Sequence, residues 1–290
     1  MVFERSKRTW FITGSSTGFG RLLAEQALAA GECVAATARN TDKISDLERQ
    51  YPTRAKAIRL NVTDKNEVAA AVEQAVSAFG HIDVLVNNAG YGLIAALEEA
   101  SEDEIRRQVE TNVHGVIHVT QAVLPHMRKQ RSGHIVNISS VGGLVSTPGL
   151  GYYNLTKFAV EGMSGALAQE VAPLGIHVTA IEPGPFRTDF AGRSVESGAK
   201  EISDYAESVG KTRAMLQALN GTQKGDPLRA VRAIQQVVNS KNPPLHLLLG
   251  AFALARFRGK LEQFQKDMAE WESVTLGADF PDDEPAKVPR

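Results

Sequence analysis

Short, almost continuously apolar runs alternate with longer amphipathic stretches along most of this chain, and this alternation constrains its fold more than any other feature. The runs are rich in Val, Ile, Leu and Ala. Several of them lack the alternation of polar and apolar residues that is typical of a strand with one solvent-exposed face. Strands that are apolar on both sides occur in parallel sheets covered by helices on each face. The predicted strands are residues 9–13, 33–38, 55–60, 82–87, 134–139, 176–181 and 245–249.

The amphipathic stretches between these runs carry recognisable helix starts. Ser101 and Glu104 have the spacing of a capping box, and Thr63-Asp64 can cap the helix that carries Val68. Strand–helix alternation of this kind gives right-handed βαβ units. The predicted fold class is therefore α/β, with a doubly wound parallel sheet in a three-layer sandwich.

The 290 residues could form one large or two small domains. The one compositional break, from Ala191 to Gly225, is rich in Ser, Gly, Lys and Glu, and we interpret it as part of a mobile substrate-loop insertion over residues 186–225. Residues 280–290 have the composition of a frayed, flexible tail. A single domain over residues 1–290 is the preferred interpretation.

Composition and charge exclude several classes of protein. A formal charge of −1 argues against a nucleic-acid-binding surface, which needs a basic excess. Cys33 is the single cysteine, which excludes an internal disulfide and favours a reducing, cytoplasmic location. Residues 1–8 lack the apolar segment of a signal peptide. The apolar stretch 245–255 is shorter than the ~20 residues of a membrane span, so we expect a buried strand running into a helix there and no transmembrane segment.

Three glycines mark the predicted turn from the first strand into the first helix. Gly14, Gly18 and Gly20 let the backbone turn tightly, and the helix start offers free N–H groups to an anion such as a pyrophosphate. An ordinary glycine-rich loop is the alternative. Asn87-Asn-Ala-Gly90 ends the fourth strand at the same edge of the sheet, where the backbone can approach the same ligand, although a simple Asn-Gly turn would look alike.

Tyr153 and Lys157 are four residues apart, so a helix places the phenol and the ammonium on one face, one turn apart. The positive charge is expected to lower the tyrosine pKa from its reference value near ~10, so that the phenol can exchange a proton with a substrate oxygen. A solvated surface pair is the alternative. A serine pair, Ser139-Ser140, follows an apolar strand just upstream.

Taken together and in this order, the motifs resemble the short-chain dehydrogenase/reductase family, in its compact single-domain branch. The resemblance implies a Rossmann-like fold with strand order 3-2-1-4-5-6-7 and NAD(P)-dependent interconversion of a carbonyl and an alcohol. The motifs lie within about residues 8–190 and are Thr13-Gly-x-x-x-Gly-x-Gly20, Asn87-Asn-Ala-Gly90, Asn112, Ser140, Tyr153-x-x-x-Lys157 and Pro183-Gly184.

The resemblance also implies roles for single residues. Tyr153 would exchange the proton, Lys157 would lower its pKa and hold the nicotinamide ribose, and Ser140 rather than Ser139 would hydrogen bond the substrate carbonyl. Asn112 would anchor a water relay reaching Lys157, although outside this pattern a helix-surface amide would be the preferred interpretation. The implied cofactor-binding residues are Gly14, Ser16, Thr17, Gly18, Phe19, Gly20, Arg39, Asn61, Val62, Asn88, Ala89, Gly90, Pro183, Gly184, Phe186 and Thr188, together with Tyr153 and Lys157.

The end of the second strand bears on the choice of cofactor. A carboxylate there pairs with the 2′-hydroxyl of NAD, whereas an arginine accommodates the 2′-phosphate of NADP. Ala38-Arg39-Asn40 has no acid, and Arg39 can make a forked contact to a phosphate. Thr17 is not the basic residue that strong NADP binders of the family often have, and Asn61 replaces the family's usual adenine-binding aspartate. NADP(H) is the favoured cofactor and NAD(H) the alternative.

We therefore expect an NADP(H)-dependent oxidoreductase that interconverts a carbonyl and a secondary alcohol. An NAD-dependent alcohol dehydrogenase and a non-catalytic nucleotide-sensing regulatory protein are the alternatives. No metal is expected, because His114 and His118, at i and i+4, have no third ligand nearby in sequence. The segments expected to select a small-molecule substrate carry apolar residues, which would suit a bulky apolar compound. Packing within the protein is the alternative role of these residues. They are Leu93, Ile94, Leu144, Val145, Leu150 and Tyr152.

Two predicted helices, near residues 101–127 and 152–172, bear on assembly. The family resemblance implies that they pair with a second subunit in a four-helix contact. We therefore expect a homodimer or homotetramer, although burial within one chain could explain part of the apolar pattern.

Overall fold

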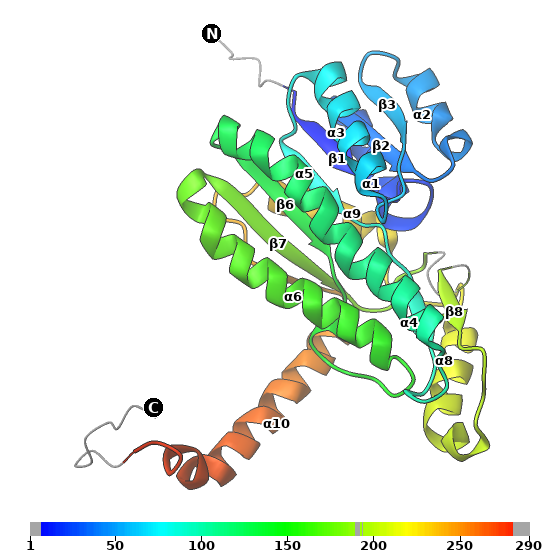
Figure 1. Cartoon of the computed structure of the whole chain (residues 1–290), viewed down its shortest axis with the longest axis vertical. Coiled ribbons are helices and arrows are strands. Elements are labelled where there is room, and N and C mark those ends of the chain that lie inside the picture. The colour runs from blue at the N-terminus through cyan, green and yellow to red at the C-terminus, as the bar shows by residue number, and fades with distance from the viewer. Residues whose placement is uncertain (1–6, 189–191, 193, 281–290) are drawn as a thin grey trace.

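The computed structural model describes residues 7–188, 192 and 194–280. Its main sheet has seven parallel strands in the order β3-β2-β1-β4-β6-β7-β9 (Figure 1). Counted along the chain without the two short strands outside this sheet, that order is 3-2-1-4-5-6-7, so the predicted topology is confirmed. The strands are β1 (Thr9–Ile12), β2 (Cys33–Ala38), β3 (Ala55–Arg59), β4 (Val84–Asn87), β6 (Gly133–Ile138), β7 (Ile176–Pro183) and β9 (His246–Leu249).

Helices cover both faces of the sheet, which gives the predicted three layers. Figure 1 shows the helices of one face crossing in front of the strands. That face carries α3 (Lys65–Phe79), α5 (Gly115–Gln130) and α6 (Gly151–Val171), and the other carries α1 (Gly18–Ala29), α2 (Ser45–Gln50) and α9 (Pro227–Val238).

The core is divided by the sheet into two apolar clusters. In β1 the side chains of Trp10 and Ile12 pack with α1 and α9, whereas Phe11 packs with α3 and α5. Successive side chains of a strand point to opposite faces, so a strand inside this sheet is buried on both faces and is mostly apolar. This burial explains the apolar runs of the sequence.

The predicted helix starts are confirmed. The Asp64 carboxylate accepts the backbone N–H groups of Asn66 and Glu67 at the start of α3. Ser101 and Glu104 form a complete capping box at the start of α4 (Glu102–Val109). The long helix expected after it is interrupted by a π-helical turn at Glu110–His114 before α5 continues.

Residues beyond the main sheet form a lobe that the sequence pattern did not predict in detail. Short strands β5 (Gly92–Ile94) and β8 (Val195–Ser197) pair in parallel, and α8 (Lys211–Leu219) follows. The predicted insertion over 186–225 thus contains a strand and a helix, and residues 189–191 and 193 of it lie outside the described residues. Shorter helical turns are Thr41–Lys43, Val141–Gly143, Ala172–Leu174, Ser203–Tyr205 and, of π type, Ala206–Gly210.

One buried ion pair fastens this lobe to the body. The Glu99 carboxylate accepts the backbone N–H groups of Ala96 and Ile202 at 2.7 and 2.8 Å, and the Arg213 guanidinium of α8 donates to it. The Glu99 side chain is fully buried and that of Arg213 is 13% exposed. Burial alone would raise the pKa of Glu99, but these donors hold it below its usual range.

As predicted for the apolar stretch 245–255, strand β9 runs into a helix, α10 (Ala251–Leu276), but only Leu249 of the strand is buried. Within the described residues, none of the helices combines the length and apolar character needed to span a membrane. The tail expected over 280–290 lies, apart from Phe280, outside the described residues.

Replacing Arg213 with alanine is expected to lower the free energy of unfolding by about 3 kcal/mol, because it leaves the Glu99 carboxylate buried without its cation. Urea denaturation followed by circular dichroism measures this change. The control is Arg229→Ala, which breaks an ion pair with Asp226 whose side chains are 84% and 49% exposed and should cost at most about 1 kcal/mol. Equal losses in the two variants would show that the lobe is not fastened by this pair.

Candidate active site

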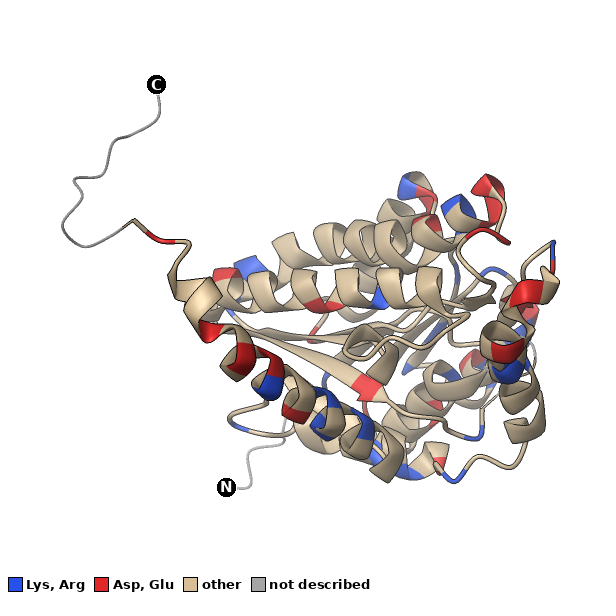
Figure 2. Cartoon of the chain, turned by 90° about the horizontal axis from the view of Figure 1, so that it is seen from below, with Lys and Arg blue, Asp and Glu red and all other residues tan. Residues whose placement is uncertain are grey.

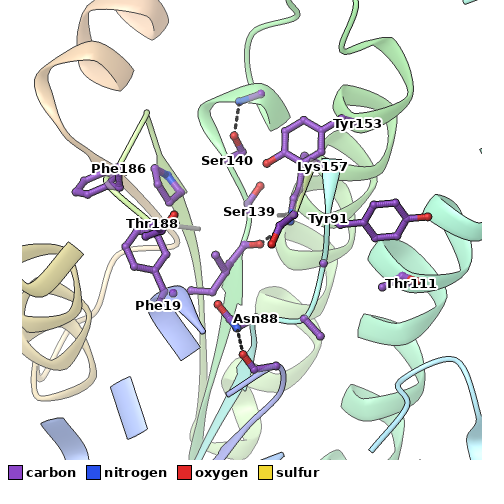
Figure 3. Close-up of a pocket in the computed structure, with 18 of the residues that line it drawn as sticks. Phe19, Asn88, Tyr91, Thr111, Ser139, Ser140, Tyr153, Lys157, Phe186 and Thr188 are labelled. Carbon is purple, nitrogen blue, oxygen red and sulfur yellow. Dashed lines mark hydrogen bonds between the residues drawn. The ribbon is translucent and has the colours of Figure 1, made fainter. Parts of the chain in front are cut away.

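A cavity of about 1010 Å³ opens at the carboxyl ends of the central strands. Its walls come from the turn after β1, the end of β2, the loops after β4, β6 and β7, and the start of α6. Figure 3 shows Ser140, Tyr153 and Lys157 on one side of this cavity and Phe19, Phe186 and Thr188 on the other. Parallel strands end together at one edge of a sheet, which is where ligands bind in folds of this type.

The sequence-predicted residues converge on this cavity. Of the four predicted catalytic residues, Ser140, Tyr153 and Lys157 line it, and Asn112 lies buried behind it. Of the predicted cofactor residues, only Gly20 is not part of the wall. The others that line the cavity are Gly14, Ser16, Thr17, Gly18, Phe19, Arg39, Asn61, Val62, Asn88, Ala89, Gly90, Pro183, Gly184, Phe186 and Thr188.

The glycine turn is held against the end of β4 by side-chain hydrogen bonds. Thr13 Oγ1 accepts the backbone N–H groups of Asn88 and Ala89 at 2.9 and 3.0 Å, and Asn88 Nδ2 donates to the carbonyls of Thr13 and Gly14. A Cβ on Gly20 would lie 2.5 Å from both Asn88 Nδ2 and the Gly14 oxygen. Gly20 is therefore required for this close packing rather than for direct contact with a ligand.

The start of α1 has the properties of an anion site. Thr17 precedes the helix, but no side chain caps it and no acidic residue occupies its first turn. In contrast, Asp64, Ser101 and Asp226 cap α3, α4 and α9 through their own oxygens. Gly18 has a φ of +57°, which side-chain-bearing residues rarely adopt. Uncapped N–H groups facing a cavity suit the pyrophosphate of a dinucleotide.

Two basic residues line the far end of the cavity beyond the end of β2. Arg39 is exposed there, as predicted, and Lys43 joins it from the following turn. Sequence reasoning missed Lys43, although a second basic residue four positions after Arg39 was a readable signal. Asn61 also lines this end, and its Oδ1 accepts hydrogen bonds from the backbone and hydroxyl of Thr63 at 3.3 and 3.1 Å. That oxygen is thus already engaged within the protein.

The catalytic candidates are brought together by the loop after β6 and the first turns of α6. Ser140 Oγ accepts the backbone N–H of Gly142 at 3.0 Å, which fixes the oxygen and leaves its proton available for donation. Ser140 is also hydrogen bonded to the Tyr153 phenol. Lys157 Nζ donates to the carbonyl oxygen of Ile138 at 2.8 Å and lies 5.8 Å from the centroid of the Tyr153 ring.

Burial dominates the acid–base properties of this pair. It raises the pKa of Tyr153 to about 12, against the opposing effect of the Ser140 hydrogen bond. It lowers the pKa of Lys157 to about 8, against the opposing effect of the Glu161 charge. The sequence-based expectation of a lowered tyrosine pKa is therefore wrong for this structure, because removing a phenolate from water costs more than the Ser140 hydrogen bond returns. At neutral pH the phenol carries its proton.

Asn112 lies in the π-helical turn between α4 and α5 and is buried. Its Nδ2 donates to the carbonyl of Tyr91 at 2.8 Å and to the hydroxyl of Thr156 at 3.1 Å, while its Oδ1 accepts the backbone N–H of Tyr91 at 3.0 Å. A Cβ on Gly90 would lie 3.1 Å from Asn112 Oδ1 and 3.8 Å from Lys157 Nζ. Asn112 therefore fixes the loop that faces Lys157, and the alternative of a surface amide is excluded.

A buried acidic pair lies behind Lys157. Glu182, in β7, is fully buried, and one of its oxygens lies 2.7 Å from Nδ1 of His246. Glu161, one turn after Lys157 in α6, lies 3.4 Å from the same nitrogen. Burial, and then the charge of Glu161, raise the pKa of Glu182 to about 7. Within the described residues this is the one carboxylate–histidine group close enough to hold a metal ion, and His114 and His118 do not belong to it.

Some of the apolar residues that line the cavity were predicted from the sequence and others were not. Val145 and Leu150 line the cavity, whereas Leu93 and Ile94 are buried in the small sheet and Tyr152 donates to the Leu97 carbonyl instead. Leu144 is also absent from the wall. Additional apolar wall residues come from α8 and α10, distant in sequence from every motif: Met215, Leu216, Leu219 and Phe252.

Comparison with known proteins supports this reading of the site. A family model described as short chain dehydrogenase matches residues 8–199. An oxidoreductase of Botryotinia fuckeliana is 40% identical over 273 residues, which cover 93% of this chain and 99% of that protein. A 3-ketodihydrosphingosine reductase of Bacteroides thetaiotaomicron is 39% identical over 249 residues, which cover 85% and 89%. The chain therefore belongs to the short-chain dehydrogenase/reductase family and is an oxidoreductase, which confirms the predicted family.

Solved structures agree. A short-chain dehydrogenase from Streptomyces avermitilis has a TM-score of 0.90 and 43% identity, covering 95% of this chain and 100% of that one. ElxO with NADP bound has a TM-score of 0.71 and 30% identity, covering 86% and 99%. A 3-ketoacyl-(acyl-carrier-protein) reductase of Brucella melitensis complexed with NADH has a TM-score of 0.70 and 27% identity, covering 83% and 96%. Together with the uncapped start of α1, these likenesses support a nicotinamide cofactor.

The raised pKa of Glu182 predicts a pH-dependent stability. Because its folded-state pKa of about 7 lies above the ordinary glutamate value near ~4.3, the folded protein binds this proton more tightly than the unfolded chain. The resulting stabilisation is present at low pH and is lost as the pH rises to 7. Glu182→Gln has no carboxyl group at this position and should not lose stability in this way. The free energy of unfolding of the variant minus that of the parent should therefore rise by roughly 2 kcal/mol from pH 5 to pH 8.

Denaturant titrations at several pH values measure this difference. Glu73→Gln, on the exposed face of α3, is the matched control and should keep a constant offset from the parent. A constant offset for Glu182→Gln as well would contradict the assignment of a buried, titrating carboxyl to this position.

Proposed function

We propose that this protein is an NADP(H)-dependent oxidoreductase that interconverts a carbonyl and a secondary alcohol on an apolar or bulky substrate. The observation that carries the proposal is the Ser140–Tyr153–Lys157 group, in which Tyr153 and Lys157 are buried and which shares one cavity with the uncapped start of α1. A dinucleotide bound at that start reaches the three side chains within the same cavity. Its nicotinamide, when bound, supplies or accepts the hydride.

The side chains supply position and a proton. In reduction, Tyr153 holds its proton at neutral pH and gives it to the substrate oxygen as that oxygen becomes an alkoxide. Ser140 donates a hydrogen bond to the same oxygen. The Gly142 N–H, which donates to Ser140 Oγ, holds the serine hydroxyl in place before the substrate binds. The positive charge of Lys157 stabilises the phenolate that remains. Asn112 holds the Tyr91 backbone and so keeps the loop beside Lys157 fixed.

NADP is the proposed cofactor rather than NAD. Arg39 and Lys43 line the end of the cavity where the adenosine ribose would lie, and their charges complement a 2′-phosphate. The lining carboxylates, Glu110 and Glu196, do not come from this segment. Asn61 already accepts two hydrogen bonds, so a contact with adenine from its oxygen would be weak.

An apolar substrate is proposed because part of the cavity wall is apolar. Val145, Leu150, Leu216, Leu219 and Phe252 contribute to it from three separate elements. The name of the Bacteroides relative, a 3-ketodihydrosphingosine reductase, is in keeping with a ketone that carries a long apolar chain. We extend that substrate class, a ketone with a substantial apolar portion, to this protein.

Tyr153→Phe is expected to lower kcat by about 10²–10⁴-fold, because the proton donor is lost, and to leave NADPH affinity within about twofold. Absorbance at 340 nm with a panel of apolar ketones measures the first effect, and fluorescence titration measures the second. Tyr152→Phe is the matched control: its hydroxyl contacts the Leu97 carbonyl, so its kcat should stay within about twofold of the parent. Activity that persists in Tyr153→Phe would remove Tyr153 from the chemistry.

Arg39→Asp is expected to shift the ratio of kcat/KM for NADPH over NADH by at least about tenfold toward NADH, because a charge-assisted contact to the 2′-phosphate is replaced by repulsion. The same assay with the two cofactors measures the ratio. Arg49→Asp changes the net charge equally at an exposed position outside the cavity, and its ratio should match the parent. An unchanged ratio in Arg39→Asp would contradict the proposed NADP preference.

A further inference from the structure

Helix α10 leaves the sheet after β9 and extends away from the rest of the molecule (Figure 1). It has 26 residues, which corresponds to a length of about 39 Å. From Arg258 to its end at Leu276, every side chain is exposed. A helix that is exposed on all sides over most of its length lacks the tertiary packing that normally stabilises helices in proteins.

The base of α10 is fixed to the body. Ala253 is fully buried, the Arg256 guanidinium donates to the Ser146 carbonyl at 3.2 Å, and Lys260 Nζ donates to the Leu144 carbonyl at 2.5 Å. The same ammonium lies 5.0 Å from the centroid of the Phe158 ring. These contacts set the direction in which the exposed part of the helix extends.

The exposed part carries an apolar seam with the spacing of a coiled coil. Successive apolar residues are separated by three, four, three, four and three positions, an average of about 3.5 that keeps them on one side of a supercoiled helix. Five of them are 40–58% exposed, and Phe257 is partly buried. The seam consists of Leu254, Phe257, Leu261, Phe264, Met268 and Trp271.

Charge is distributed unevenly along the same helix. Arg256, Arg258 and Lys260 lie near its base, whereas Asp267, Glu270 and Glu272 lie toward its end. Figure 2 shows blue segments near the base of α10 and red segments farther out. Two such helices side by side and antiparallel would place the basic part of each against the acidic part of the other, whereas a parallel pair would place like charges together.

The net charge of α10 also argues against the binding of its apolar seam to a lipid surface. The helix contains Lys266 and Glu262 in addition to the residues above, so that four basic and four acidic side chains cancel. An amphipathic helix bound to an anionic membrane needs a basic polar face, which this helix lacks over its outer half.

We propose that α10 pairs with α10 of a second copy of this chain, antiparallel, through the Leu254–Trp271 seam. Self-pairing of this kind is isologous and closes after two subunits. It is separate from the contact that the family resemblance implies for α5 and α6, so the two together would give a tetramer and α10 alone a dimer.

The first test compares the mass of full-length variants by analytical ultracentrifugation over a range of concentrations. Phe264→Lys places a charge in the seam at a position that is 58% exposed in the single chain, so folding should be retained. Its particle mass should be half that of the parent, or its dissociation constant at least tenfold higher. Gln263→Lys adds the same charge to the adjacent, non-seam position and should behave as the parent. Equal masses for all three proteins would overturn the proposal.

The second test determines the direction of pairing. Arg258 and Glu272 each follow an aromatic residue of the seam, Phe257 and Trp271, and therefore lie on the same edge of it. When the Leu254–Trp271 seams of two antiparallel helices overlap in full, Arg258 of one copy lies about 8 Å along the axis from Glu272 of the other, whereas parallel helices separate them by about 21 Å. Arg258→Glu and Glu272→Arg should each weaken association, and the double variant should restore it. A double variant weaker than either single variant would overturn the antiparallel arrangement.

A lipid occupant gives a different result in a third measurement. Vesicles of phosphatidylcholine with phosphatidylglycerol are added to the parent and to Phe264→Lys, and the tryptophan emission is recorded. Trp271 is 58% exposed, whereas the other tryptophan, Trp10, is buried, so a blue shift reports on α10. The proposal expects no shift on adding vesicles. A vesicle-dependent shift that Phe264→Lys abolishes would overturn self-pairing in favour of a membrane surface.

Discussion

The hydrogen bonds that join the ends of β1 and β4 are the interaction on which the rest of the site depends. Thr13 and Asn88 exchange bonds through side chain and backbone, and Gly20 leaves the space that this approach requires. The first helix then begins at the edge of the sheet where β6 and β7 also end. The candidate cofactor site and the candidate catalytic group are thereby brought into one cavity, although they lie more than a hundred residues apart in sequence.

Most of the fold could be predicted from the sequence because the central sheet imposes a strong pattern. A strand with helices on both faces is buried on both sides and is therefore mostly apolar, as Trp10, Phe11 and Ile12 show on alternate sides. The strands β5 and β8 escaped prediction for the opposite reason. They have three residues each and pair only with one another, so both lack the length that makes a strand recognisable, and β8 also lacks burial on its two faces.

The candidate site was predictable where residue identity is decided by local geometry, and unpredictable where it depends on surroundings. The Tyr153–Lys157 spacing follows from helix periodicity, but the pKa values follow from burial, which no local spacing specifies. The interruption of the helix at Asn112 is a property of its backbone rather than of a residue pattern. Leu216 and Phe252 reach the cavity only through the way in which α8 and the first turn of α10 pack in the folded chain.

The first turn of α10 lines the cavity, and the rest of the helix extends to the outer surface of the molecule. Phe252 and Arg256 line the cavity, and Phe252 lies 3.3 Å from the position that a Cβ on Gly184 would occupy. The apolar seam begins within the same turn and continues outward. The base of α10 is held by the burial of Ala253 and by the Arg256 and Lys260 contacts, and pairing with a second copy would also hold the outer part of the helix. Because Phe252 and Arg256 of the same helix line the cavity, pairing through α10 would couple the position of this part of the wall to assembly.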